Sequence, residues 1–259
     1  MRLLLAIDIG NTNIVFGLFD LEQGKKAPLL HSWRIATARE RTADEYGFMF
    51  QELLRRPGIE LSFVSEMVIA SVVPPIHPVM ETCCQRYFDV EPLWIGPGVK
   101  TGLKVSVDNP NELGADRIAN CVGALEKLNP PLIVVDLGTA TTFDVVNKQR
   151  EYLGGMIAPG IKISAEALFQ RAARLPRVEI AKPEKLVGRN TVQAMQSGLY
   201  YGCVGQIDGI LERLSQHYPD ASIVATGGLA KTVSKESNYI QHVEPDLTLN
   251  GLRAIWRKN

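Results

Sequence analysis

The most constraining feature of this 259-residue chain is a short segment that occurs twice, once in each half. In the first copy, an apolar run over residues 3–7 leads to Asp8, an apolar residue and Gly10, and the chain becomes apolar again after three polar residues. The second copy has the same order around Asp136 and Gly138, and the two aspartates lie 128 positions apart. Each copy predicts a strand, a tight turn and a returning strand. A repeat separated by half the chain predicts two related domains.

The segments between and after these copies alternate between strand and helix signals. The expected helices lie over residues 42–56, 78–88, 114–128 and, as one helix or two, 191–214, and buried strands are expected over 67–73 and 222–225. The glycine-rich residues 154–160 are expected to form a rigid loop that lines a nucleotide, or a simple turn. The alternation favours an α/β fold. We expect the domain boundary close to the helix at 114–128, which gives domains over 1–118 and 119–259.

Composition excludes several classes of partner. Lys plus Arg equals Asp plus Glu at 28 each, so no excess positive charge favours nucleic acid or an anionic membrane. No apolar run approaches the roughly 18 residues of a membrane span, and the N-terminal run has no cleavage site. The four cysteines form no C-x-x-C pair and the histidines have no metal-ligand spacing. We therefore expect a cytoplasmic protein with reduced thiols.

The repeated turn has the residue types that bind nucleotide phosphates. Glycine lets the backbone approach an anion, backbone N–H groups and Asn or Thr side chains donate to phosphate oxygens, and an aspartate holds hydrated Mg²⁺. One such turn is a weak signal, because Asp and Gly commonly end strands. Two copies, together with a strand that leads into Thr226-Gly227-Gly228, predict a phosphate site split between two related domains. The chain has neither a G-x-x-x-x-G-K-[ST] loop nor a G-x-G-x-x-G turn after a strand.

This arrangement resembles the actin, hexokinase and Hsp70 superfamily of duplicated ATP-binding domains, and further motifs resemble one family in it, the type III pantothenate kinases. The matching motifs, in chain order, are Asp8–Asn13, Ser71–Pro75, Asp108-Asn109-Pro110, Gly114–Arg117, Asp136–Thr141, Gly154–Gly160, Leu175-Pro176, Gly188–Thr191, Ala194–Gly198 and Thr226–Gly228. The resemblance implies two actin-like (ribonuclease H-like) domains with a nucleotide cleft between them. It also implies ATP-dependent phosphorylation of (R)-pantothenate to 4'-phosphopantothenate, the first step of coenzyme A biosynthesis.

The same resemblance implies ligands and site residues. ATP with Mg²⁺, a monovalent cation (K⁺ or NH₄⁺) and a homodimer are expected. The implied ATP-binding residues are Asp8, Ile9, Gly10, Asn11, Thr12, Asn13, Ile14, Val15 and Thr139. The implied pantothenate-binding residues are Gly114, Ala115, Asp116, Arg117 and Thr191, with Asp116 as the proton acceptor, and Asp136 is the implied ligand of the monovalent cation. Because the stretch after Thr191 lies at the twofold interface in proteins that resemble this one, each site is expected to combine Asp116 of one subunit with Thr191 of the other.

The segment Gly114–Arg117 also has a physical reading of its own. It places an acid beside a guanidinium group at a helix start, where the helix dipole favours an ionised Asp116. An ionised carboxylate can orient a primary alcohol and accept its proton, and Arg117 can hold a carboxylate with two hydrogen bonds. The simpler alternatives are a first-turn acid and a surface ion pair. At Val107, many members that resemble this chain have Tyr, so an aromatic contact to the substrate is in doubt.

Two rival functions remain open on sequence alone. A sugar kinase or acetate-type kinase of the same superfamily would need a substrate loop unlike Gly114–Arg117. A regulatory accessory protein would keep the fold without turnover. The neutral net charge and the presence of Asp8, Asp116 and Asp136 argue against the second rival.

Overall fold

The chain divides into two compact units. The computed structural model describes residues 1–259, except for the side chains of residues 25 and 26. Unit 1 contains residues 1–104, 108–126 and 246–259, and unit 2 contains residues 105–107 and 127–245. The units therefore interleave along the chain, in contrast to the expected division at residue 118.

Unit 1 contains a five-stranded sheet in the order β3-β2-β1-β4-β5. Its strands are β1 (Leu3–Ile9), β2 (Asn13–Asp20), β3 (Leu29–Ala36), β4 (Val64–Ser71) and β5 (Leu93–Trp94). The central strand β1 pairs antiparallel with β2 and parallel with β4. Its near-continuous apolar sequence suits a strand that is buried on both faces.

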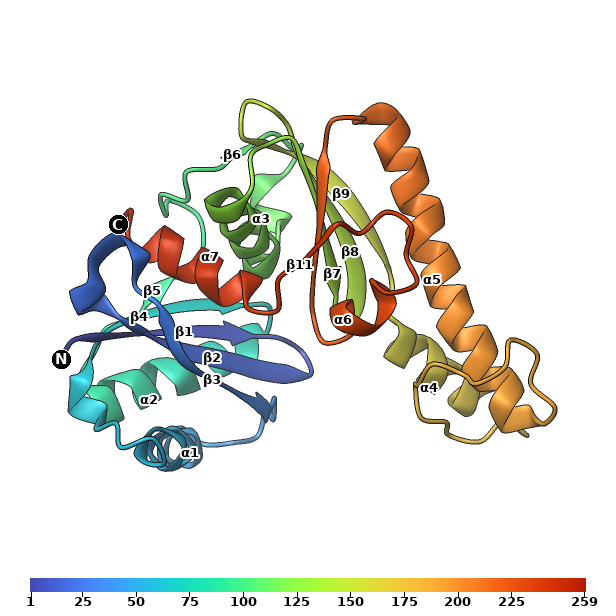
Figure 1. The fold of residues 1–259 in the computed structure, drawn as a ribbon. Coiled ribbons are helices and arrows are strands. Elements are labelled where there is room, and N and C mark those ends of the chain that lie inside the picture. The colour runs from blue at the N-terminus through green and yellow to red at the C-terminus, as the bar shows by residue number, and fades with distance from the viewer. The chain divides into compact units, whose positions relative to one another are not determined.

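Helices cover both faces of this sheet. They are α1 (Ala43–Arg55), α2 (His77–Phe88), α3 (Ala115–Lys127) and α7 (Leu247–Trp256), with short 3₁₀ turns at Leu21–Lys26, Leu61–Phe63, Pro74–Ile76 and Pro110–Glu112. Figure 1 shows α1 and α2 on one face and α3 and α7 on the other. Leu5 and Ile7 belong to the core that includes α1 and α2. Because strand side chains alternate, Asp8 points toward the face that carries α3 and α7.

The C-terminal helix belongs to unit 1 because it packs very closely against α3. A Cβ atom on Gly251 would overlap the carbonyl oxygen of Ala119, and one on Gly123 would overlap the carbonyl of Leu247. The Thr248 hydroxyl also donates to Asn120 Oδ1 at 2.6 Å. Two glycines thus permit a helix crossing that larger residues would block, and this long-range contact explains why a single cut in the chain does not separate the units.

Unit 2 repeats the strand arrangement of unit 1. The sheet has the order β11-β10-β7-β8-β9-β6, in which β9-β8-β7-β10-β11 corresponds to β3-β2-β1-β4-β5. The strands are β6 (Lys104–Val105), β7 (Leu132–Leu137), β8 (Ala140–Val146), β9 (Glu151–Pro159), β10 (Ser222–Thr226) and β11 (His242–Val243). As in unit 1, the central strand β7 pairs antiparallel with the next strand and parallel with β10. The predicted duplication is therefore present in the fold.

The helices of unit 2 are α4 (Ile161–Arg171), α5 (Thr191–His217) and α6 (Ala230–Val233). Residues 191–214 form part of the single helix α5. The expected glycine-rich loop at 154–160 is instead mostly the strand β9, which pairs with β8 along its length. A bulge at Leu153 explains part of the glycine content, since Gly154 has φ +120°, a conformation that favours glycine.

Across the described residues, none of the helices has both the length and the apolar character needed to span a membrane.

Candidate active site

The first phosphate-type turn lies at the carboxyl end of β1. Asp8 pairs with Val15 of β2 and with Ala70 of β4, so the carboxylate comes from a strand that is hydrogen-bonded on both sides. The N–H of Gly10 donates to the carbonyl of Asn13 at 3.0 Å, which closes the turn. Asn11 and Thr12 are exposed at its tip. The turn therefore offers polar groups on a rigid base.

Two of the implied ATP-binding residues have fully buried side chains. Ile9 and Ile14 are fully buried in the core of unit 1. Any contact that they make with a ligand is through the backbone, because their side chains face the packed interior. Their packing in the core fixes the two ends of the turn.

Thr37, which the sequence analysis did not single out, braces this turn. Its hydroxyl donates to the carbonyl of Gly10 at 2.7 Å, and its N–H donates to the carbonyl of Thr12 at 3.0 Å. Thr37 follows the last residue of β3, so the neighbouring hairpin fixes the position of the turn. The only signal in the sequence is a threonine directly after a strand.

The segment Gly114–Arg117 lies near the same edge of the unit 1 sheet. The N–H of Val72 donates to the carbonyl of Ile9 at 3.0 Å, which places Val72 beside the end of β1. A Cβ atom on Gly114 would lie 3.7 Å from Val72 Cγ1. The start of α3 and the Asp8 turn are thus brought to one edge of the sheet, as the sequence predicts for residues of one site.

The Asp116 carboxylate folds back over the start of its own helix. Its Oδ1 accepts from the Arg117 N–H at 2.8 Å, and a Cβ atom on Gly114 would lie only 2.5 Å from the same oxygen. Burial raises the pKa of Asp116 above the ordinary value of 3.8, and the Arg117 N–H and guanidinium charge oppose this shift. The helix dipole alone predicts the ionised form, but desolvation dominates. A carboxyl with a raised pKa is a better proton acceptor once it is ionised.

The second turn lies at the carboxyl end of β7. Asp136 pairs with Thr142 of β8 and with Thr226 of β10. A Cβ atom on Gly227 would lie 2.6 Å from Asp136 Oδ1, so the carboxylate packs against the Gly227 backbone. The predicted Thr226-Gly227-Gly228 segment therefore lies beside Asp136.

Gly160 packs against the tip of this second turn. A Cβ atom at Gly160 would overlap the carbonyl oxygen of Thr139 and would lie 2.8 Å from that of Gly138. Thr139 is exposed, so its side chain is accessible to a ligand. The glycine that ends the 154–160 segment thus lets a backbone pass directly against the turn.

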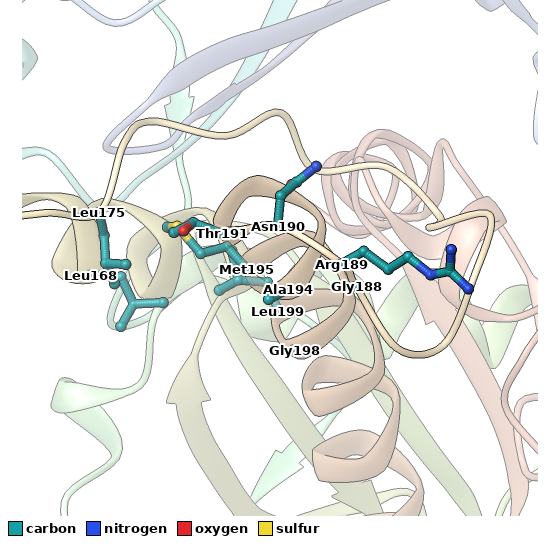
Figure 2. A pocket seen from close by; sticks show the side chains of 10 residues that line it. All are labelled: Leu168, Leu175, Gly188, Arg189, Asn190, Thr191, Ala194, Met195, Gly198 and Leu199. Atoms are coloured by element: carbon teal, nitrogen blue, oxygen red, sulfur yellow. The ribbon is translucent and has the colours of Figure 1, made fainter.

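Thr191 is the first residue of α5 and lines a separate pocket in unit 2. The Asn190 side chain caps the helix by accepting from the Gln193 N–H at 2.9 Å. The pocket has a volume of about 630 Å³ and is lined mainly by apolar and small residues. Figure 2 shows Thr191 and Met195 near Leu168, with the Arg189 side chain extending away from them.

The donor groups fit a nucleotide with Mg²⁺ better than a closed protein cage for a metal. Among the described residues, no cluster of three or more His, Cys, Asp or Glu side chains could hold a metal ion. Mg²⁺ usually keeps several waters and binds one or two carboxylates together with substrate phosphates. Asp8, with the exposed amide and hydroxyl groups of its turn, fits that mode of binding.

The family model described as Type III pantothenate kinase matches residues 4–213 of the chain. A type III pantothenate kinase of Exiguobacterium sibiricum is 51% identical over 257 residues, which cover 99% of this chain and 100% of that protein. One from Koribacter versatilis is 51% identical over 263 residues, covering 99% of this chain and 96% of that protein.

Solved structures with low sequence identity share the fold. An inorganic polyphosphate/ATP-glucomannokinase from an Arthrobacter strain has a TM-score of 0.52 at 13% identity, with 100% of both chains covered. A Campylobacter jejuni protein described in terms of the Baf family of transcriptional activators has a TM-score of 0.59 at 20% identity, with 98% of both chains covered. These two proteins support the actin-like fold, whereas the family model and the two relatives at 51% identity specify one branch of it: the chain belongs to the type III pantothenate kinase family.

Proposed function

We propose that this chain transfers the γ-phosphoryl group of ATP to the terminal hydroxyl of pantothenate, giving 4'-phosphopantothenate and ADP. The observation that carries this proposal is the placement of Asp116 and the Asp8 turn at one edge of the unit 1 sheet. A proton acceptor and a phosphate-type turn are the two parts that a small-alcohol kinase has to bring together.

Asp116 acts as the proton acceptor in the proposed reaction. Its carboxylate orients the hydroxyl group, whose oxygen attacks the γ-phosphorus as the bond to the β-phosphate oxygen breaks. The hydroxyl proton passes to a carboxylate oxygen, and ADP is the leaving group. Arg117, next in the helix, holds the pantothenate carboxylate and fixes the opposite end of the substrate. Alignment supplies most of the rate enhancement in such a transfer.

In the proposed reaction, both turns help to neutralise the negative charge of ATP. Asp8 and the polar tip of its turn hold the phosphates and Mg²⁺, which when bound neutralises the charge that develops on the phosphoryl oxygens. Thr139 contacts ATP from the second turn. We place a K⁺ or NH₄⁺ ion at Asp136, where it offsets charge in a chain that has no phosphate-loop lysine.

The test is the release of ADP by the purified protein with pantothenate and K⁺ present together or omitted in turn. We expect turnover only with pantothenate, and stronger turnover with K⁺ or NH₄⁺ than with Na⁺. A panel of sugars and acetate replaces pantothenate as the acceptor control. Turnover on one of these acceptors in preference to pantothenate would refute the assigned substrate.

A homodimer is the second part of the proposal, and an exposed apolar surface supports it. Apart from Met1 and Phe48, every exposed large hydrophobic side chain among the described residues lies between positions 153 and 192. These residues are Leu153, Met156, Ile157, Ile163, Leu168, Phe169, Leu186, Val187 and Val192. An exposed apolar side chain is costly in water, and such side chains concentrated in one segment of a chain are typical of a segment that another protein covers. The proposed partner is a second copy of this chain. The proposed location of the dimer is the cytoplasm.

We place Thr191 of one subunit in the site that contains Asp116 of the other. Because the interface is isologous, a dimer then has two equivalent shared sites. Asp116→Asn and Thr191→Arg should each be inactive alone. After subunit exchange, half of the dimers are hybrids with one intact site each, so activity should recover to about a quarter of wild type. No recovery in mutants that demonstrably exchange would exclude the shared site.

A further inference from the structure

A buried carboxylate in unit 2 has no role in the proposed reaction. Asp144 lies on β8 and is 0% exposed. Its neighbours in sequence, Phe143 and Val145, belong to the apolar core of unit 2, so Asp144 points to the opposite face of the sheet. Thr142, two residues earlier, shares that face and donates to Asp144 Oδ2 at 3.4 Å. A buried carboxylate needs such donors, because desolvation of a charge is costly.

Tyr152 donates a shorter hydrogen bond to the same carboxylate. Its hydroxyl donates to Asp144 Oδ1 at 2.7 Å, and its side chain is 1% exposed. Tyr152 lies on β9 directly before the bulge at Leu153. The hydrogen bond therefore fixes β9 to β8 at the place where the regular ladder is interrupted.

The backbone of Tyr152 holds the segment that leads toward the substrate site. Its carbonyl accepts from the Ser106 N–H at 2.9 Å. The following residue, Val107, lies against β9, since a Cβ atom on Gly154 would be 3.9 Å from Val107 Cγ1. From Val107 the chain continues through Asp108-Asn109-Pro110 to the predicted pantothenate-binding segment at 114–117.

We propose that Tyr152 is a positioning residue for pantothenate, which acts by fixing residues 105–107 through its hydrogen bonds to Asp144 and Ser106. The hydroxyl bond to Asp144 holds β9 in place, and the carbonyl bond to Ser106 transmits that position to the strand that precedes the substrate segment. This inference rests on the proposed function. It assigns Tyr152 no contact with substrate and no part in proton transfer.

The experiment compares Tyr152→Phe with wild type in steady-state kinetics for both substrates, well below the unfolding temperature. We expect the KM for pantothenate to rise by at least about fivefold, because small misplacements of a binding segment have large effects. The KM for ATP and the kcat should stay within about twofold. A variant that is merely less stable would not raise the KM for pantothenate while leaving the KM for ATP unchanged.

The matched control is Tyr87→Phe. Tyr87 donates to Asp44 at 3.0 Å in a similar Tyr–Asp pair, but on the exposed surface of unit 1. Tyr87→Phe should leave the KM values for pantothenate and ATP unchanged. In an Asp144→Asn background, Tyr152→Phe should raise the pantothenate KM less than in wild type, because the two residues act through one shared hydrogen bond that Asp144→Asn already alters.

A second variant keeps the test informative if Tyr152→Phe does not fold. Ser106→Pro removes the N–H that donates to Tyr152, whereas Ser106→Ala keeps it. Only the proline variant should raise the pantothenate KM. Wild-type kinetics in Tyr152→Phe, or equal increases in both KM values, would overturn this inference alone. Absence of pantothenate-dependent turnover in the wild-type protein would instead defeat the proposed function, and this inference with it.

Discussion

The two phosphate-type turns share their strand pairing but differ in what holds them. In unit 1, the Gly10 N–H bonds to the carbonyl of Asn13, whereas in unit 2 the Gly138 N–H bonds to the carbonyl of Ala140, so the second turn is one residue shorter. The residue that follows β3 in unit 1, or the corresponding strand β9 in unit 2, braces each turn. In unit 1 it is Thr37, which uses a hydroxyl hydrogen bond, and in unit 2 it is Gly160, which uses direct backbone contact.

This difference is consistent with the separate roles that we propose for the two turns. The longer turn presents more polar groups at its tip, which suits phosphates with Mg²⁺. The shorter turn packs its aspartate against the Gly227 backbone, which suits a single fixed ligand at Asp136. In the proposed function, the start of α3 adds the proton acceptor at the edge of unit 1.

The largest effect is expected for Asp116→Asn. The amide keeps the shape of the side chain but cannot accept the proton, so kcat should fall by about a hundredfold or more, which corresponds to ~2.7 kcal/mol. ATP binding, measured by calorimetry, should be retained. A kcat near that of wild type would contradict the role of Asp116 as proton acceptor. The proposed functional difference between the sheet edge of unit 1 and that of unit 2 would then lose its main support.

The two aspartates of the repeated turns should respond to different ions. Asp8→Asn should raise the Mg²⁺ concentration needed for half-maximal activity by roughly tenfold and leave the K⁺ response unchanged. Asp136→Asn should shift the K⁺ response by a similar factor and leave the Mg²⁺ response unchanged. Titration of each ion at saturating levels of the other measures both shifts. If both variants shift the response to the same ion, the turns have not diverged in the way proposed.

The two braces should differ in their tolerance to substitution. Gly160→Ala introduces a methyl group into occupied space, so we expect a loss of about 1–3 kcal/mol in the free energy of unfolding. Thr37→Ala removes one side-chain hydrogen bond, for which about 0.5–1.5 kcal/mol is expected. Urea unfolding measures both. Thr37→Ser is the matched control, because it keeps the hydroxyl and should be close to wild type. A harmless Gly160→Ala would show that backbone contact does not hold the second turn.

The smallest effect concerns the raised pKa of Asp116. Burial raises this pKa in the folded protein, so the folded state binds the proton more tightly than the unfolded state does. The free energy of unfolding therefore falls as the pH rises from about 3.8 through the raised pKa. Asp116→Asn removes this cost. Its Tm should exceed that of wild type at neutral pH, and the difference should shrink toward low pH. Turnover by wild type should fall as pH drops through the same raised pKa. A constant Tm difference across pH would contradict this assignment.

Much of the fold follows from local patterns in the sequence. The strand–turn–strand repeat around Asp8 and Asp136 predicts the two related sheets, because a buried strand ended by Asp and Gly has few other solutions. The capping box at Thr42 predicts the start of α1, and both of its hydrogen bonds are present. These features depend on residues that are close together in the chain, so the sequence displays them directly.

The parts that were missed depend on contacts between distant residues. The glycines at 154–160 suggested a loop, but their conformations serve a bulge in β9 and the close approach of Gly160 to Thr139. The raised pKa of Asp116 results from burial that no spacing rule displays. A charged residue within an apolar strand was the available signal for Asp144, and the partner, Tyr152, is defined only by strand pairing.

The packing of α7 against α3 has a consequence for synthesis of the protein. A ribosome has translated all of the proposed site residues once it passes Thr191, yet the helix that supports the Asp116 segment is encoded at 247–256. A nascent or prematurely terminated chain would therefore contain every proposed catalytic and binding group while α3 lacked its tightest neighbour. The support of α3 therefore comes from a helix encoded after every proposed site residue, so deletion of residues 247–256 should weaken the Asp116 segment without removing any of those residues.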